Sequence, residues 1–227
     1  MCTIDRSWPL CLSLLLVSMS LAAKPAMLSR DWGEPVPLGR CVVVTDNTAI
    51  GTRIVEALEA KGAKATVLGG KEACNDTGLT WHNTLLDATA IVIGGIHNNP
   101  AMLPLYAHYL AYGDVAYPGG DGAVIRTIAR PFGKDTMAIA IEASSPAGEE
   151  RAVSRFCEML SDLEELVFPV TMEAALSDER AAAVKRLRPD ASRYALTGDP
   201  ANAAAALKSL LAQSGEKQLW GNGSDYS

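Results

Sequence analysis

The chain has 227 residues, 48% of them hydrophobic, and a formal net charge of -6 from 20 Lys and Arg against 26 Asp and Glu. This content of apolar side chains excludes an intrinsically disordered chain and supplies a core. The acidic balance argues against a nucleic-acid partner, because proteins that bind phosphate backbones carry a clustered excess of Lys and Arg.

Residues 1–22 have the pattern of a secretory signal peptide. An apolar run extends from Pro9 to Leu21, and the small residue Ala22 follows it. The basic character before the run is weak, with Asp5 beside Arg6, so a non-cleaved anchor or a misassigned start stays an alternative. No later segment reaches the ~18 apolar residues that span a bilayer. The sequence therefore predicts a secreted or periplasmic protein without membrane contact after cleavage.

Cysteine and histidine spacing predicts no metal site. After the signal, Cys41, Cys74 and Cys157 are too few and too far apart for a disulfide framework or a zinc knuckle. Two of them fall on apolar segments and are expected to be buried, whereas Cys74 is expected in a polar loop. The histidines have no paired spacing: His82, His97 and His108. We expect neither a metal nor another cofactor.

Hydrophobic periodicity predicts an α/β domain over residues 39–168, after an irregular lead-in over residues 23–38. Runs of apolar and β-branched residues predict strands, and apolar residues at helical spacing predict helices. Ser145 and Pro146 have the positions of an N-cap and a first helical residue. The expected strands are Cys41–Thr45, Lys64–Leu68, Ala88–Ile93, Ala123–Ala129 and Thr136–Ala143, and the expected helices are Ala49–Lys61, Pro100–Tyr112 and Ala147–Leu163.

The segment Arg130–Asp135 joins two of these strands and contains Pro131 and Gly133. Such a short connection favours an antiparallel hairpin over a helical crossover. The predicted fold class is therefore α/β, a mixed sheet with βαβ units and a late antiparallel hairpin, followed by a C-terminal helical segment.

Residues 177–227 are expected to be helical, with helices over Asp178–Leu196 and Ala201–Gln213. The junction between them carries Gly198 for a left-handed stop and Asp199 for a cap. Two helices with apolar faces and no further partner indicate that the chain is a fragment of a longer protein or that these helices dock on the sheet domain.

The stretch VVVTDNTAIGTRIVEALEAKGAKATVL has the strand-helix-strand order of a dinucleotide-binding unit. Its first turn carries only one glycine, Gly51, and Asp46 would place a negative charge beside a phosphate. No Tyr is followed four positions later by Lys, so the proton-donating pair of short-chain dehydrogenases is absent. An NAD(P)-dependent oxidoreductase is therefore disfavoured.

Two other stretches carry a resemblance. IVIGGIHNNPAMLPLYAHYLAYGDVAYPGGDGAVIRT and MAIAIEASSPAGEERAVSRF resemble the small α/β domain that precedes the catalytic domain of alpha-glucuronidases and beta-hexosaminidases. In that domain the corresponding strand reads Glu-Gly-Tyr-x-Ile-Arg, whereas this chain has Asp121 and Ala123 at the first and third positions. The similarity covers about 130 residues and concerns the fold and its turn glycines.

The closing stretch SRYALTGDPANA resembles a helix pair of the (α/α) toroid in heparinase II/III-like polysaccharide lyases. Together, the two resemblances imply a non-catalytic N-terminal domain of an exported polysaccharide-degrading enzyme, a lyase or a glycoside hydrolase. Its implied partners are the enzyme's own helical catalytic domain and a polysaccharide. A stand-alone glycan- or small-ligand-binding module is the alternative.

No catalytic residue is assigned. The carboxyl end of the third strand is the expected ligand site, because open α/β sheets bind ligands at such strand ends. The glycine-rich loop before the fourth strand is expected beside it. As a purely structural alternative, Asn98 and Asn99 would cap the following helix, and Asp121 would pair with Arg126. The candidate ligand-binding residues are Gly94, Gly95, His97, Asn98, Asn99, Tyr117, Asp121 and Arg126.

Overall fold

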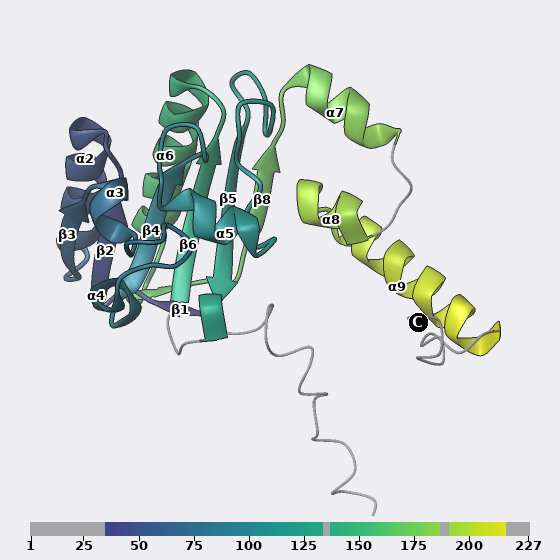
Figure 1. Ribbon diagram of the computed structural model, residues 1–227, viewed down its shortest axis with the longest axis horizontal. Coiled ribbons are helices and arrows are strands. Elements are labelled where there is room, and N and C mark those ends of the chain that lie inside the picture. The colour runs from purple at the N-terminus through teal and green to yellow at the C-terminus, as the bar shows by residue number, and fades with distance from the viewer. Residues whose placement is uncertain (1–34, 134–136, 187–190, 217–227) are drawn as a thin grey trace, which may run out of the picture.

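The computed structural model describes residues 35–133, 137–186 and 191–216 (Figure 1). The expected signal peptide and all but the last four residues of the expected lead-in lie outside these ranges. No helix within them is long and apolar enough to cross a membrane.

The strands form a six-stranded sheet and a separate two-stranded ribbon. The large sheet has the order β3-β2-β4-β6-β5-β8, and β1 pairs with β7 in the ribbon. The strands are β1 (Val36–Pro37), β2 (Arg40–Val44), β3 (Lys64–Leu68), β4 (Thr89–Gly94), β5 (Ala123–Ala129), β6 (Met137–Ala143), β7 (Val167–Phe168) and β8 (Met172–Ala175).

Strands β3, β2, β4 and β6 are parallel, whereas β5 is antiparallel to both β6 and β8. In the register of the last hairpin, Ala123 lies opposite Ala143 and Ala129 opposite Met137. The predicted fold class is therefore confirmed, including the late hairpin. In the order of the sheet, the later strand of that hairpin, β6, lies between β4 and β5. All of its residues are buried.

Helices cover both faces of the large sheet (Figure 1). Helices α2 and α6 share one core with the sheet, and α3, α4 and α5 contribute to a second core on the opposite face. Helices α7, α8 and α9 follow the edge strand β8. The helices are α2 (Thr48–Ala60), α3 (Gly70–Ala73), α4 (Asn83–Leu86), α5 (Met102–Ala107), α6 (Pro146–Ser161), α7 (Asp178–Lys185), α8 (Ala191–Thr197) and α9 (Pro200–Glu216), with a 3-10 turn η1 at Pro131–Gly133.

The helix caps read from the sequence are present. Ser145 Oγ accepts a hydrogen bond from the Gly148 backbone N–H at 3.1 Å at the start of α6. Asp199 Oδ1 accepts one from Ala201 N–H at 2.9 Å at the start of α9. Between α8 and α9, Gly198 has a φ of +66°, the left-handed conformation that favours glycine. These local signals fix where each helix begins or ends.

The helix expected over Pro100–Tyr112 is shorter than predicted. It comprises only Met102–Ala107, because Tyr109 adopts a left-handed φ of 59° and turns the chain away. The apolar periodicity continued past this point and carried no sign of the turn.

The single helix expected over Asp178–Leu196 is also wrong. The structure has two helices here, α7 and α8, separated by residues 187–190, which lie outside the described ranges. The sequence places Pro189 in this interval. A proline inside a helix removes a backbone donor and clashes with the preceding turn.

The sheet extends past the expected end of the α/β domain at residue 168. Strand β8 has the sequence MEAA, and its residues Met172–Ala175 pair with Ala123–Arg126 of β5. Ala, Met and Glu favour helices, so tertiary pairing overrides local preference in this strand.

Cys74 lies where the loop after α3 begins, but it is buried, so a reactive role for it is not supported. It caps the end of α3, pairs in an isolated bridge with Trp81, and only 8% of it is exposed. Burial raises the pKa of its thiol, which disfavours the reactive thiolate. Cys41 is buried and Cys157 half-buried, and all three are free thiols.

The packing of α2 on β3 gives a test of the core. A Cβ on Gly51 would lie 2.9 Å from Val67 Cγ1 and 3.1 Å from Thr45 Cγ2, whereas a Cβ on Gly39 would meet nothing within 4 Å. We expect Gly51→Val to lower the free energy of unfolding by about 1–3 kcal/mol through overpacking. Urea denaturation measures the loss. The control Gly39→Val should cost clearly less, and equal losses would contradict this packing.

Candidate functional site

The order in which the chain adds strands to the sheet reverses between β2 and β4, whose carboxyl ends lie side by side. From β2 the chain crosses to β3 on one side and then returns to β4 on the other side. In open α/β sheets, ligands bind in the crevice outside the strand ends at such a switch point. An open hollow of about 520 Å³ lies there, within the size range of small-molecule sites, and five of the eight described residues that line it are exposed. We refer to it as the switch-point cavity.

The wall of the switch-point cavity is mostly polar. Five of its residues follow β2, two belong to β4 and the loop after it, and one comes from the first turn of α6. They are Thr45, Asp46, Asn47, Thr48, Ala49, Ile93, Asn98 and Glu149. In the part of the chain that the structure describes, neither a Lys nor an Arg lines it.

Backbone hydrogen bonds orient several of these side chains. Asp46 Oδ1 accepts from Gly70 N–H at 2.9 Å, and Asn98 Oδ1 accepts from Gly95 N–H at 2.8 Å. Asn47 is the N-cap of α2, where its side chain accepts from Ile50 N–H. The polar groups are therefore fixed before any ligand arrives.

Glu149 is the most unusual residue of the cavity. The residue is only 7% exposed, yet no hydrogen bond or ion pair joins its carboxyl group to any residue of the described ranges. Desolvation by burial raises the pKa of this carboxyl above its ordinary value of 4.5. A buried carboxyl normally has a polar partner, so this one is satisfied by solvent or a ligand in the cavity.

Of the predicted residues after β4, only Asn98 lines this cavity. The two glycines allow the loop to fold on itself: a Cβ on Gly94 would lie 2.5 Å from Asn98 Oδ1, and one on Gly95 would lie 2.8 Å from the His97 ring. Gly94 also has a φ of +112°. These residues shape the site more than they line it.

Asn99 is buried and connects two strand ends. Its Nδ2 donates to Val44 O at 2.9 Å and to Ile93 O at 2.8 Å, and its Oδ1 accepts from Ala101 N–H at 3.0 Å. The expected capping by Asn98 and Asn99 is wrong: the N-cap of α5 is Ala101, which has no side-chain cap bond. Asn99 instead fixes the carboxyl ends of β2 and β4 side by side.

The remaining predicted residues lie near β5, and the expected pairing of Asp121 with Arg126 is wrong. The Arg126 Nε donates to Glu142 Oε1 in a salt bridge whose side chains are 8% and 0% exposed. Desolvation opposes the charge of Arg126, but the Glu142 carboxylate raises the pKa of the guanidinium. Asp121 pairs with Arg151 at 3.3 Å on the surface.

The loop from Tyr117 to Gly122 is filled by protein contacts. Tyr117 is buried, which raises the pKa of its phenol, and its hydroxyl donates to Leu196 O of α8 at 2.5 Å. A Cβ on Gly119 would lie 2.7 Å from both Ser177 Oγ and Arg180 Cγ at the start of α7. The absence of a side chain on Gly119 therefore leaves the space in which the start of α7 packs against this loop.

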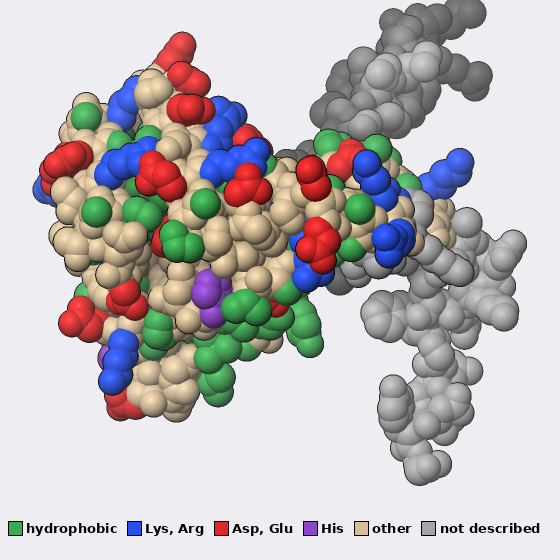
Figure 2. All heavy atoms as spheres, turned by 90° about the horizontal axis from the view of Figure 1, so that it is seen from above, with side chains coloured by type: hydrophobic (Ala, Val, Ile, Leu, Met, Phe, Trp, Pro, Cys, Tyr) green, Lys and Arg blue, Asp and Glu red, His purple; other side chains and the backbone are tan. Residues whose placement is uncertain are grey.

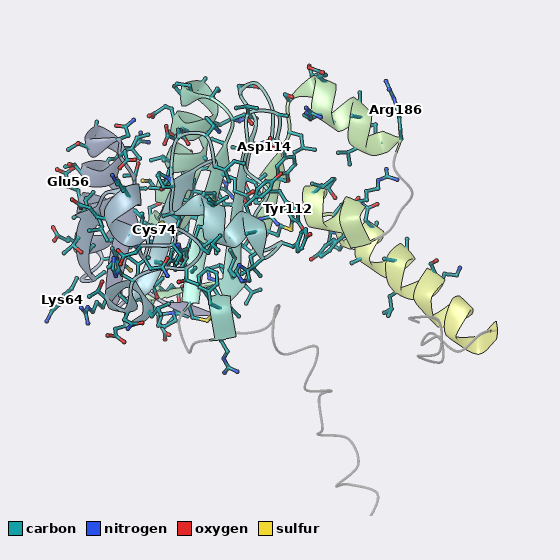
Figure 3. All side chains as sticks on the ribbon, in the orientation of Figure 1. Glu56, Lys64, Cys74, Tyr112, Asp114 and Arg186 are labelled. Atoms are coloured by element: carbon teal, nitrogen blue, oxygen red, sulfur yellow. The ribbon has the colours of Figure 1, made fainter. Side chains whose placement is uncertain are left out.

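A second cavity, of about 280 Å³, lies where β5 and β8 meet α8. Tyr112 is one of its walls and points into the space between the sheet and α8 (Figure 3). The Arg126 guanidinium carbon lies 5.2 Å from the centre of the Tyr112 ring, a cation–π contact. Tyr109 and Tyr194 complete the aromatic part of the wall.

Sequence reasoning missed Glu142 and Glu149. Glu142 carried a weak signal as the sole charged residue of the apolar strand MAIAIEA. Glu149 looked like an ordinary acidic residue at a helix start, where carboxylates are common. Its burial depends on the loops after β2 and β4, which are distant in sequence.

Charges of both signs are interleaved on the surface that Figure 2 shows. Arg53 pairs with Glu150, and Arg155 pairs with both Glu158 and Glu173. Within the described ranges, no group of three His, Cys, Asp or Glu residues is arranged to hold a metal ion.

No protein-family model matches the chain, and no curated protein matches it in sequence.

The buried ion pair of Arg126 with Glu142 should contribute more to the free energy of unfolding than the exposed pair of Asp121 with Arg151. Glu142→Gln leaves Arg126 with a buried charge, so we expect it to lower the free energy of unfolding by about 3–5 kcal/mol. Asp121→Asn removes a solvent-exposed pair and should change it by less than about 1 kcal/mol. Chemical denaturation of both variants compares them. Similar losses would contradict the burial of Arg126 and Glu142.

Ionisation of the neighbouring residues Glu149 and Glu150 should change the stability of the fold in opposite directions. The folded-state pKa of Glu149 is raised by burial, so its ionisation lowers stability as pH rises from 4.5 through that value. The folded-state pKa of Glu150 is lowered by its hydrogen bond to Arg53. The ionised Glu150 therefore stabilises the fold fully above pH 4.5, and this stabilisation is lost as the pH falls. We expect Glu149→Gln to stabilise and Glu150→Gln to destabilise the chain at pH 7.

The difference in stability between each variant and the parent chain should shrink at acid pH. For Glu149→Gln it disappears below pH 4.5, where the carboxyl is protonated in both the folded and the unfolded chain. Thermal denaturation across pH 3–8 measures them. Shifts of the same sign at pH 7 would contradict the different environments of the two carboxyls.

Proposed function

We propose that this chain is a non-catalytic α/β domain of an exported polysaccharide-degrading enzyme, in which it supports and orients a helical catalytic domain. The observation that carries the proposal is the joint between the sheet and the C-terminal helices. The resemblance of the sheet to accessory domains and of the helices to an (α/α) toroid agrees with this role.

Contacts of three kinds make the joint. The Tyr117 hydroxyl donates to α8, and Ser177 N–H donates to Pro118 O at 3.3 Å. A Cβ on Gly198 would lie 2.4 Å from Met172 O, so the turn between α8 and α9 lies directly on β8. A backbone contact this close requires glycine on one side. The helices are thus held at a defined position on the edge of the sheet.

The exposed part of α9 favours a larger helical partner. The helix extends away from the sheet beyond α8 (Figure 1). Its residues Asn202 and Ala206 are buried near the joint, whereas Leu207 is 58% exposed. In the proposed enzyme, further helices of the same protein pack against this helix and cover Leu207. We propose export through the signal peptide at residues 1–22.

A stand-alone binding module for a glycan or another small ligand is the second candidate. The switch-point cavity favours it, because Glu149 is buried there without a protein partner. Phosphate ligands are disfavoured at the same place: Asn47 already caps α2, and Asp46 adds negative charge. An NAD(P)-dependent oxidoreductase is therefore the weakest alternative.

The joint gives a test of the supporting role. Tyr117→Phe removes one buried hydrogen bond, which typically contributes about 1 kcal/mol. We expect faster hydrogen exchange of the backbone amides of α8 and little change in β2 and β4. The control Tyr106→Phe removes a hydroxyl that binds Asp114 at 3.4 Å and should leave α8 unchanged. Equal exchange of α8 in all three proteins would contradict the joint.

The absence of catalysis is tested on the purified chain. We expect no cleavage of a polyuronate, followed by the absorbance of unsaturated products and by the release of reducing ends. Turnover by the purified chain that survives repeated purification would overturn the non-catalytic assignment.

A further inference from the structure

We infer that the switch-point cavity binds a small ligand through the ligand's hydrogen-bond donors, hydroxyl or ammonium groups, with the Glu149 carboxyl as the central acceptor. This inference rests on the binding-module candidate of the proposed function. The joint with the C-terminal helices is made at β5 and β8, the last two strands in the order of the sheet, and its loop also contacts the start of α6, where the Ser145 hydroxyl donates to Gly120 O at 2.5 Å.

The charge of the cavity wall excludes anions. Asp46 and Glu149 carry two carboxyl groups, and no Lys or Arg among the described residues lines the cavity. Helices α2 and α6 both begin there, and each N-terminus contributes about +0.5 of an elementary charge. With both carboxyls ionised, about one negative charge remains. A phosphate or carboxylate would be repelled, whereas an ammonium or a hydroxyl would not.

The hydrogen bonds that hold Asp46 and Asn98 in place leave further acceptor capacity on these side chains for a ligand. Asp46 and Asn98 each use one side-chain oxygen to hold a loop amide, which fixes the orientation of the group. Such fixed polar groups lose little rotamer freedom on binding. The apolar residues of the lining are Ala49 at the exposed rim and the buried Ile93. This mixture suits a ring that carries hydroxyls on its edges.

Glu149 distinguishes this cavity from an ordinary acidic surface. More than nine tenths of the residue is buried, and its carboxyl group faces the cavity without a partner in the described ranges. Its oxygens are not among the fully buried side-chain atoms without a partner in the described ranges, so solvent in the cavity reaches them. A ligand donor would take the place of that solvent.

Three pyranoses of matched size test the ligand chemistry: D-glucose, D-glucosamine and D-glucuronate. They differ in carrying a hydroxyl, an ammonium or a carboxylate. Saturation-transfer NMR with titration at millimolar concentrations and pH 7 gives their affinities. We expect D-glucosamine or D-glucose to bind saturably and D-glucuronate to bind most weakly. Tighter binding of D-glucosamine identifies an ammonium ligand, and equal binding of the two identifies hydroxyls as the recognised donors.

A pair of matched variants tests the role of Glu149. Hydrogen bonds to a charged group contribute about 1.5–3 kcal/mol, which corresponds to a loss of about tenfold or more in affinity. We expect this loss for Glu149→Gln and no change for Glu150→Gln, because Glu150 is 59% exposed and pairs with Arg53 outside the cavity. Ala49→Met, which fills part of the exposed rim, should also weaken binding without changing the carboxyl.

The outcomes separate the inference from the function on which it rests. If none of the three sugars binds, the inference and the binding-module candidate both fail, and only the supporting role stays. If D-glucuronate binds as tightly as the other two, or if Glu149→Gln binds like the parent chain, the module binds sugars but the assigned chemistry is wrong.

Discussion

The salt bridge between Arg126 and Glu142 is the constraint around which the second half of the molecule is arranged. Two charges taken out of water are tolerated only when each has a partner and further hydrogen bonds. Glu142 therefore also accepts from Tyr112 N–H at 2.6 Å, and the Tyr112 ring covers the guanidinium. The chain after α5 must pass over β5 to provide these contacts, and the same loop continues to Tyr117, which holds α8.

Local signals in the sequence predicted most of the central fold. Strands β3 and β5 begin and end at the predicted residues, and the caps of α6 and α9 are those read from Ser145 and Asp199. These features depend on short-range chemistry. Strand β8 and the end of α5 could not be predicted in this way, because the first depends on pairing with β5 and the second on a left-handed Tyr109.

Of the candidate residues predicted from the sequence, the structure places only Asn98 in the wall of the switch-point cavity. The general rule for open sheets gave the carboxyl end of β4, and Asn98 does line a cavity there. The other glycines and Asn99 hold the loop, and Asp121 and Arg126 have separate partners. Glu149 is buried in the first turn of α6 and lines the cavity with residues from the segments after β2 and β4. No periodicity or motif encodes such a meeting of distant segments.

The position of β6 between β4 and β5 has a consequence for synthesis of the chain. Strands β2, β3 and β4 emerge first and can pair with one another, but β5 emerges before the strand that will join it to them. Until β6 is inserted, the apolar residues of β5 and the edge of β4 have no strand beside them. Exposed edges of this kind are where chains associate wrongly. The sheet can therefore close only after the chain has been made as far as Ala143.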